Sequence, residues 1–160
     1  MLTSRWVRCH KIISRHNWAH AKPLLLESIR NSDFVAFDYE LTGLHQKNER
    51  YLGEDEAYIA HSEGVKAFIP VQLGICACKY NSDTLKWDLT PASIYVYPWM
   101  SGLEENAHFS VSTAALNFLV SNGFDLNKWI LDGVSWLTPL QEMEARSTIK
   151  SRLDEISEMK

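Results

Sequence analysis

The chain has 160 residues, of which 46% are apolar and 22% charged, and this composition lies in the ordinary range for one soluble globular domain of mixed structure. Its formal net charge of -4 argues against a protein that binds nucleic acid over its whole surface, so any such contact is expected in a groove. No run of about 18 apolar residues predicts a membrane span, and three cysteines are too few for a disulfide framework, which favours a reducing compartment.

The N-terminal stretch is basic, because the first 26 residues contain no acidic side chain. Arg-rich mitochondrial transit signals share this composition, so two interpretations stay open: a transit signal, or a stretch that belongs to the fold. We expect residues 1–11 to form a basic extension, and the absence of repeats and linkers leaves residues 12–160 as one unit. The basic residues concerned are Arg5, Arg8, Lys11, Arg15 and Lys22.

The first predicted elements are a helix and a strand. Apolar residues at helical spacing predict a helix from about Ala19 to Arg30, which accommodates Pro23 only if the proline lies in the first turn. Asn17 or a neighbour is a candidate cap. Residues 34–41 are rich in aromatic and β-branched side chains, which predicts a buried strand, and Thr42-Gly43 ends it.

The middle of the chain predicts a hairpin. The polar stretch from His45 to Lys66 is expected to form a loop with at most a short helix. The apolar run from Ala67 to Tyr80 predicts a central strand, and the following Asn81-Ser82-Asp83 predicts a turn. The return strand is expected near Ser93 to Tyr97, so the front half should hold three antiparallel strands in sequence order.

Helices are predicted in the last third. Ser112 can cap the first of them, and Asn122-Gly123 supplies its left-handed stop. Asp125 can cap a second helix that runs through Ile130. The tetrapeptide at 138–141, Thr-Pro-Leu-Gln, combines a capping box with proline at the first helical position, and it starts a charged helix toward the C-terminus.

Two acidic residues stand out in the first long strand. Asp38 and Glu40 are two residues apart, so both side chains project from the same face of the strand. Two neighbouring carboxylates on a buried strand oppose each other's ionisation and lose water. Mg²⁺ or Mn²⁺ removes both penalties, and two such ions about 4 Å apart can promote phosphodiester cleavage. The alternative is a strand at a sheet edge whose acids simply face water.

Histidine and cysteine pairs offer weaker metal candidates. His16 and His20 are four residues apart and can share a helix face, but no third ligand is evident, so solvated or capping roles are favoured. Cys76 and Cys78 share one strand face and cannot bridge each other without breaking its geometry. Core packing is the favoured interpretation for both thiols.

The strand that carries the acids, with the preceding hydrophobic run and the following Thr42-Gly43-Leu44, resembles the first motif of DEDD exonucleases. The branch it resembles holds poly(A)-specific ribonuclease and its CAF-type deadenylase relatives. The resemblance covers the chain from about Ile12 to at least Leu137. The matching segments, in order, are Ile12–Arg15 with Asn17-Trp18, Asp33–Leu44, Glu49–Tyr51, Val71–Cys76, Tyr95–Pro98, Phe118-Leu119, Gly123–Lys128 and Gly133–Leu137.

The resemblance implies an α/β (α+β) ribonuclease H-like exonuclease fold, with residues 12–160 as the N-terminal part of the nuclease domain, antiparallel strands followed by helices. It implies Mg²⁺-dependent removal of the 3′ poly(A) tail of single-stranded RNA, in a site where four acids and a general-base histidine bind two ions. Only Asp38 and Glu40 carry over as catalytic and metal-binding residues. Asp125, Asp132 and Asp154 do not match the remaining motifs, so whether this chain alone is an enzyme stays open.

Contacts with RNA are expected close to the first motif, at Leu41 and Thr42 and at Arg50 and Tyr51 in the following polar loop; a surface ion pair of the arginine with nearby acids is an equally good interpretation. The aromatic residues at 95, 97 and 99 can stack bases, although core packing is favoured for them.

A catalytically inactive derivative that binds RNA or protein is the alternative function. Its incomplete sheet would then be covered by a second copy or by another protein. The expected location is the nucleus or the cytoplasm, with the mitochondrion as the alternative if the basic N-terminus is a transit signal.

Overall fold

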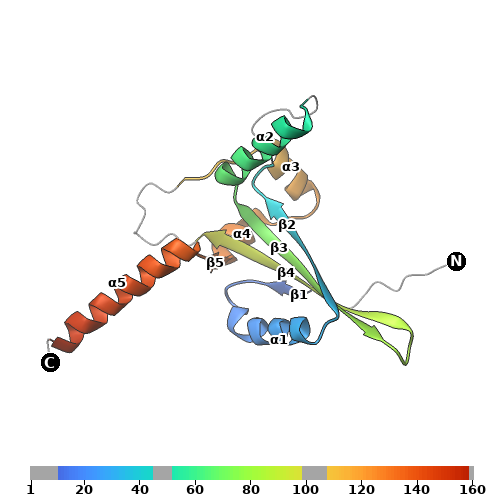
Figure 1. Cartoon of the computed structure of the whole chain (residues 1–160), viewed down its shortest axis with the longest axis horizontal. Helices are drawn as coiled ribbons and strands as arrows, with labels where there is room; N and C mark the ends of the chain where they lie inside the picture. The colour runs from blue at the N-terminus through green and yellow to red at the C-terminus, as the bar shows by residue number, and fades with distance from the viewer. Residues whose placement is uncertain (1–10, 45–51, 99–107, 159–160) are drawn as a thin grey trace.

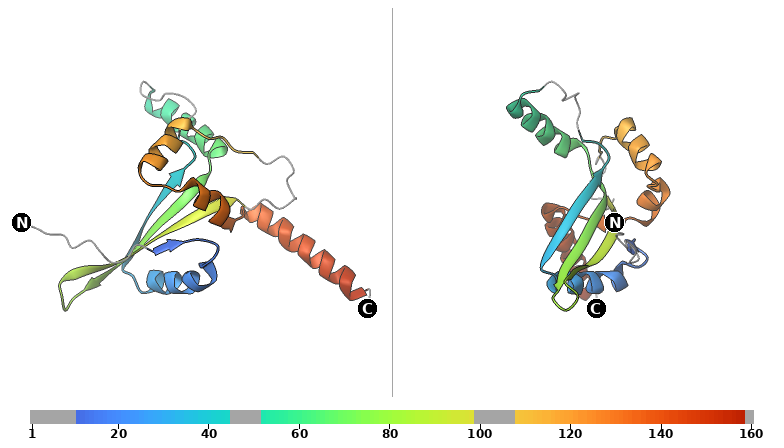
Figure 2. Two further views of the ribbon diagram at one scale, coloured as in Figure 1. Left: turned by 180° about the vertical axis from the view of Figure 1, so that it is seen from behind. Right: turned by 90° about the vertical axis from the view of Figure 1, so that its right-hand side faces the viewer.

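The computed structural model describes residues 11–44, 52–98 and 108–158. Helices and strands mix along this part of the chain around one sheet, from which α5 extends away (Figure 1, Figure 2). The elements, in order, are β1 (Lys11–Ile13), α1 (Trp18–Arg30), β2 (Phe34–Leu41), α2 (Glu54–Ala67), β3 (Pro70–Asn81), β4 (Lys86–Pro98), α3 (Thr113–Ser121), α4 (Leu126–Asp132), β5 (Val134–Trp136) and α5 (Pro139–Glu158).

The sheet order is β1-β4-β3-β2, with β5 paired to β4 beyond the end of β1. The pairs β2–β3 and β3–β4 are antiparallel, which confirms the prediction of three antiparallel strands in sequence order. Both β1 and β5 run parallel to β4. Within the described ranges β2 pairs only with β3, so it forms an edge of the sheet.

The hairpin between β3 and β4 is longer than predicted. Its return strand begins at Lys86 rather than near Ser93, because the Asn81 side chain accepts hydrogen bonds from two backbone N–H groups of the turn and fixes a tight reversal. Pro91 lies in this early part of β4, where β1 does not yet pair with the strand. A strand tolerates proline on an unpaired edge. The sequence did not predict this part of β4, because proline usually indicates that a strand is absent.

Two helices differ from their predictions. In α1, Pro23 is the sixth residue rather than a first-turn residue, so its missing N–H leaves the Ala19 carbonyl without its helical partner. The Asn17 side chain does not cap the helix, since it accepts from the Ser14 N–H and donates to the Ile12 carbonyl. Helix α2 has 14 residues where only a short helix was expected. Three acidic side chains lie in its first turn, where their negative charge interacts favourably with the helix dipole and stabilises the helix.

The predicted caps of the later helices are confirmed. Ser112 accepts a hydrogen bond from the Ala115 N–H, and Gly123 after α3 has a φ of 82°. Asp125 accepts from two N–H groups at the start of α4. At the start of α5, Thr138 and Gln141 exchange the two hydrogen bonds of a capping box.

Buried side chains pack on both faces of the sheet. Ile94 belongs to a cluster with Leu25 of α1, and its neighbour Tyr95 belongs to a second cluster with Leu119 of α3. Because adjacent residues of a strand face opposite ways, the two clusters lie on opposite faces. The prediction that β2 is buried is wrong: Phe37 is 70% exposed, because the strand lies at the sheet edge. Among the helices in the described ranges, none combines the length and apolar character needed to cross a membrane.

Candidate metal and nucleic-acid site

The sheet holds the two acids side by side near the end of β2. Asp38 lies opposite Gly74 and Glu40 opposite Gln72 on β3, and the register continues to Tyr95 on β4. The even spacing of the acids places both carboxylates on one face, as predicted. A row of hydrogen-bonded strands therefore fixes the direction of both side chains, which is the geometry that a shared cation requires.

The two carboxylates differ in their surroundings. Glu40 is half-buried, and burial raises the pKa of its carboxyl, with the charge of Asp38 adding to the rise. Asp38 is exposed, and its Oδ1 accepts a hydrogen bond of 3.0 Å from the Tyr39 N–H. Ionisation of Glu40 is therefore costly, and the neighbouring charge of Asp38 increases this cost.

This donor set fits a hard divalent cation, because two carboxylates offer oxygen ligands and a bound cation would offset the penalty at Glu40. In the part of the chain that the structure describes, no three or more His, Cys, Asp or Glu side chains gather as a complete ligand group. The described residues therefore offer two carboxylates, which are fewer ligands than a divalent cation takes.

A cavity of about 440 Å³ adjoins Glu40 on the α3 side of the sheet. Its floor is formed by strand residues, and its wall comes from the C-terminal part of α3 and the residues that follow. Polar and aromatic groups both face it, which suits a ligand with a planar ring and hydroxyl groups. The lining residues are Ile12, Glu40, Gln72, Ser93, Tyr95, Phe118, Leu119, Asn122, Gly123 and Phe124.

Most of this cavity was not foreseen from the sequence. Phe118 and Asn122 reach the site only because α3 packs over the sheet, and such a long-range contact leaves no local pattern in the sequence. Gln72 did leave a signal, because it is a polar side chain inside an apolar strand. Its pairing with Glu40 explains that polarity, since both side chains face the cavity.

Thr42 fixes the end of β2. It is 0% exposed, its hydroxyl donates to the Ser110 carbonyl at 2.8 Å, and it accepts from the Ile69 N–H at 3.1 Å. The Thr42 carbonyl also accepts from the Ser112 N–H, the cap of α3. A side chain enclosed in this way is not accessible to RNA in this structure, so its role is to join β2 to β3 and α3.

The other predicted RNA contacts are not brought together by the described residues. Leu41 is half-buried beside Glu40, and Arg50 and Tyr51 lie outside the described residues, as does Trp99. These contacts stay predictions. Tyr95 is 5% exposed, which confirms core packing for it.

The acids that did not match the family motifs have other partners. Asp125 caps α4 through two backbone N–H groups, and Asp132 Oδ1 lies 2.9 Å from His16 Nε2. His16 is therefore engaged with α4, whereas His20 lines a separate cavity, so the two histidines do not form a common site. Asp154 lies on the exposed part of α5.

The thiols are packed as expected. The Sγ atoms of Cys76 and Cys78 are 3.8 Å apart without a disulfide, and Cys78 is 4% exposed. Burial raises the pKa of the Cys76 thiol, and the hydrogen bond with Cys78 adds to the rise, so the thiol form is favoured at neutral pH. Neither observation points to a soft-metal site.

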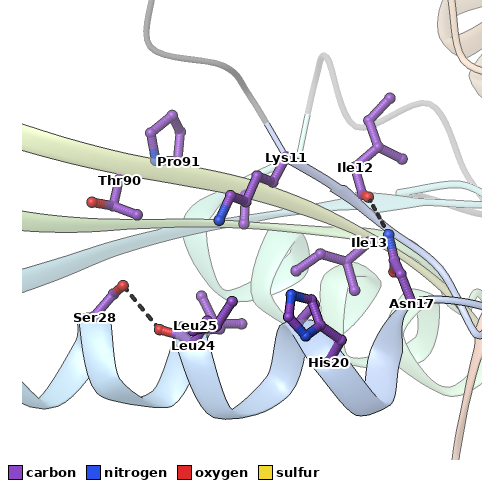
Figure 3. A pocket seen from close by; sticks show the side chains of 12 residues that line it. Lys11, Ile12, Ile13, Asn17, His20, Leu24, Leu25, Ser28, Thr90 and Pro91 are labelled. Atoms are coloured by element: carbon purple, nitrogen blue, oxygen red, sulfur yellow. Dashed lines mark hydrogen bonds between the residues drawn. The ribbon is translucent and has the colours of Figure 1, made fainter.

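A second cavity of about 260 Å³ lies between α1, β1 and β4 (Figure 3). Leu24, Leu25 and Ile13 give it a mostly apolar lining, and Lys11 and His20 also line it. Neither carboxylate of the candidate metal pair reaches it, so it is separate from the site at Glu40.

Comparison with known proteins relates the chain to ribonucleases. It is 29% identical over 149 residues to the poly(A)-specific ribonuclease PARN of Arabidopsis thaliana, an alignment that covers 88% of this chain and 21% of that protein. It is 26% identical to the poly(A)-specific ribonuclease PNLDC1 of Mus musculus, over 79% of this chain and 25% of that protein. It is 24% identical to the pre-piRNA 3′-exonuclease trimmer of Bombyx mori, over 81% and 25%. The chain thus spans a fifth to a quarter of the length of these relatives.

Solved structures of Pop2 nucleases share the fold. The Mg²⁺- and Mn²⁺-bound form of Pop2p from S. pombe matches with a TM-score of 0.54 at 14% identity, covering 78% of this chain and 47% of that one. The RNase domain of yeast Pop2 matches with a TM-score of 0.53 at 17% identity, covering 79% and 43%. These matches confirm the predicted ribonuclease H-like fold. The model of the CAF1 ribonuclease family matches residues 13–160, and the chain therefore belongs to this family.

Proposed function

We propose that the chain carries the first part of the active site of a poly(A)-specific 3′-exoribonuclease, with Asp38 and Glu40 as ligands of a divalent cation. The observation that carries the proposal is the pair itself: two carboxylates on one face of β2, one with a pKa raised by burial and by the other's charge, beside a cavity of about 440 Å³. Family membership and the PARN relatives support the same assignment.

Mg²⁺ or Mn²⁺ is the cation that this donor set suits, because both ions prefer oxygen ligands. The Pop2p structure in its Mg²⁺- and Mn²⁺-bound form supports this choice. In a complete site, two ions would polarise the phosphodiester and activate the attacking water. The chain's own contribution is to hold two carboxylates in place before the metal binds, through the hydrogen-bonded register of β2 and β3.

The cavity beside Glu40 is proposed to receive the 3′-terminal nucleotide. Phe118 is 61% exposed at its wall and offers a ring for a base, while Gln72, Ser93 and Asn122 offer hydrogen-bonding groups for a ribose. Leu41 follows Glu40 directly but does not line this cavity, so its proposed contact is with RNA outside it.

Oligoadenylate hydrolysis tests the proposal. Any Mg²⁺-dependent shortening of a 5′-labelled oligoadenylate from its 3′ end is expected to require both carboxylates, so Asp38→Asn and Glu40→Gln should each abolish it. Asp154→Asn, on the exposed face of α5, is the matched control and should retain it. Hydrolysis that survives both site substitutions would refute the assignment.

The exposed edge of β2 supports a proposal about assembly. Phe37 is 70% and Tyr39 48% exposed on the face opposite the carboxylates, and β2 has no partner beyond β3 within the described residues. We infer that another polypeptide covers this edge, in the simplest case a second copy of the chain. Sedimentation velocity should show dimers that Phe37→Lys converts to monomers; a wild-type monomer at all concentrations would refute the second copy.

Family membership does not favour the catalytically inactive alternative.

The location is proposed to be nuclear or cytoplasmic, where the RNA substrate would be found. A fluorescent protein fused to the C-terminus tests this, because accumulation in mitochondria would identify the basic N-terminus as a transit signal instead.

A further inference from the structure

Three aromatic side chains are exposed together near the turn of the β3–β4 hairpin. The tip of this hairpin projects beyond the rest of the sheet (Figure 1, Figure 2). Phe34 is 51%, Tyr80 44% and Trp87 50% exposed. The ring of Trp87 lies at the centre, 5.2 Å from the ring of Phe34 and 5.3 Å from that of Tyr80. We call these three residues the aromatic group. Exposed rings that contact one another form a patch, which marks a binding surface more often than scattered apolar residues do.

The aromatic group lies on the same face of the sheet as the carboxylate pair. Phe34 precedes Asp38 by four residues on β2, and an even spacing keeps both side chains on one face. Tyr80 and Trp87 are directly opposite each other, and Tyr80 is two residues from Cys78, the partner of Phe34. Four strand residues span about 13 Å, which separates the group from the metal pair.

Small side chains occupy the face between the two groups. Ala36 lies between Phe34 and Asp38 on β2, and the facing residues of β3 are Gly74 and Cys76. None of these three projects far from the sheet. An extended strand of nucleic acid could therefore follow this face from the carboxylates to the aromatic rings.

We propose that the aromatic group is a stacking platform for unpaired bases of single-stranded RNA, a few nucleotides upstream of the 3′ end held at Glu40. The proposal rests on the proposed exonuclease function and names a further contact for the same substrate. Every base has a π-face, so aromatic rings bind single strands without regard to sequence. The three rings are edge-to-face rather than stacked on one another, with interplanar angles of 66° and 61°, which leaves ring faces for bases.

Position favours RNA over a protein as the occupant, because the aromatic group shares a face of the sheet with the carboxylate pair. Exposed lysines precede two of the rings, Lys79 before Tyr80 and Lys86 before Trp87. Strand alternation directs them to the opposite face, but the hairpin is only two strands wide and about 5 Å separates the strands, so long lysine side chains can reach phosphates at its borders. Three acids lie close to these lysines. Asp33 accepts the Tyr80 N–H at 2.6 Å, Asp88 accepts from the Asn81 side chain, and Asp83 is exposed in the turn, so the hairpin carries charges of both signs.

Binding of RNA by variants of the full chain tests the platform. All variants carry Asp38→Asn so that the RNA stays intact, and fluorescence anisotropy measures affinity for a labelled long oligoadenylate and for the dinucleotide ApA in Mg²⁺ at one salt concentration. Trp87→Ala should weaken binding of the long oligoadenylate about tenfold and leave ApA binding unchanged, because the dinucleotide does not reach the hairpin. Trp87→Tyr keeps a ring and should restore most of the affinity.

Tyr58→Ala is the matched control, because this tyrosine of α2 is 77% exposed and its helix lies at the opposite end of β2 from the β3–β4 hairpin (Figure 1). It should bind both RNAs as the parent does, and circular dichroism should show that all variants are folded. Unchanged binding of the long oligoadenylate by Trp87→Ala would overturn the platform. A shift of Trp87→Ala from dimer to monomer with unchanged RNA affinity would do so as well, and would assign the rings to a second copy. Hydrolysis that survives Asp38→Asn and Glu40→Gln would count against the proposed function alone, because the platform is measured by binding.

Discussion

Glu40 illustrates how position changes the chemistry of a common side chain. Burial and the adjacent charge of Asp38 both raise its pKa, so the folded state holds the Glu40 proton more tightly than the unfolded state. Below the unfolded pKa both states are protonated and the carboxyl has no effect. As the pH rises through the folded pKa, ionisation costs folding free energy, so Glu40 lowers stability at neutral pH when no metal is bound.

Glu40→Gln should therefore raise the melting temperature at neutral pH in EDTA. The gain should disappear near pH 3, where the wild-type carboxyl is protonated in both states. Thermal unfolding followed by circular dichroism measures both values, with Glu155→Gln on the exposed surface of α5 as the control that changes neither. A variant less stable than the wild type at neutral pH would show that the carboxylate is stabilised in the fold.

Substitution of Thr42 should lower the stability of the fold, whereas Glu40→Gln should raise it. Thr42→Val keeps the shape of the side chain but removes two part-buried hydrogen bonds, leaving the Ser110 carbonyl and the Ile69 N–H without these partners. The expected loss is about 1–3 kcal/mol of unfolding free energy. Urea denaturation measures it against Thr113→Val, an exposed residue at the start of α3. Equal stability of the two variants would show that water replaces the lost bonds.

At this scale, the sequence identified the carboxylate pair because strand alternation is a local rule. The sequence predicted an RNA contact at Thr42, because a threonine after the strand that carries the two acids has the same local pattern whether it is exposed or buried. Burial depends on Ser110 and Ile69, which are remote in sequence, so no local pattern reveals it.

Among the elements, caps were the most predictable features, since a cap and its N–H groups are close in sequence. Asp125→Ala should cost about 1 kcal/mol, because the carboxylate accepts hydrogen bonds from the N–H groups of Asn127 and Lys128. Chemical denaturation measures this loss. Asp154→Ala, inside the exposed α5, is the comparison variant and should be close to neutral; an equally small effect of Asp125→Ala would show that α4 is held by packing alone.

Element boundaries were less predictable where packing decides them. The early part of β4 contains Pro91 and charged residues, yet pairing with β3 extends the strand back to Lys86. In α1, Pro23 lies in the second turn, although the local rule confines proline to the first. The helix is nevertheless formed, because Leu25 and its neighbours pack on the sheet.

At the scale of the whole molecule, the order of β2, β3 and β4 followed from the sequence of apolar runs and one turn. The exposure of β2 could not be predicted in this way, because its composition resembles that of a buried strand. The burial of a strand depends on its neighbours in the sheet. The carboxylate pair thus lies on a strand with only one partner among the described residues, next to a cavity built by α3. This arrangement makes metal binding the property on which the functional proposal depends.

Isothermal titration of the 160-residue chain with Mn²⁺ tests that property most directly. The wild-type chain and Asp154→Asn should bind the ion, and Asp38→Asn and Glu40→Gln should each bind it about 10- to 100-fold more weakly or not at all, because each removes one of two carboxylate ligands. Equal Mn²⁺ affinity in all four proteins, or no binding by the wild-type chain, would contradict the assignment of Asp38 and Glu40 as a metal site.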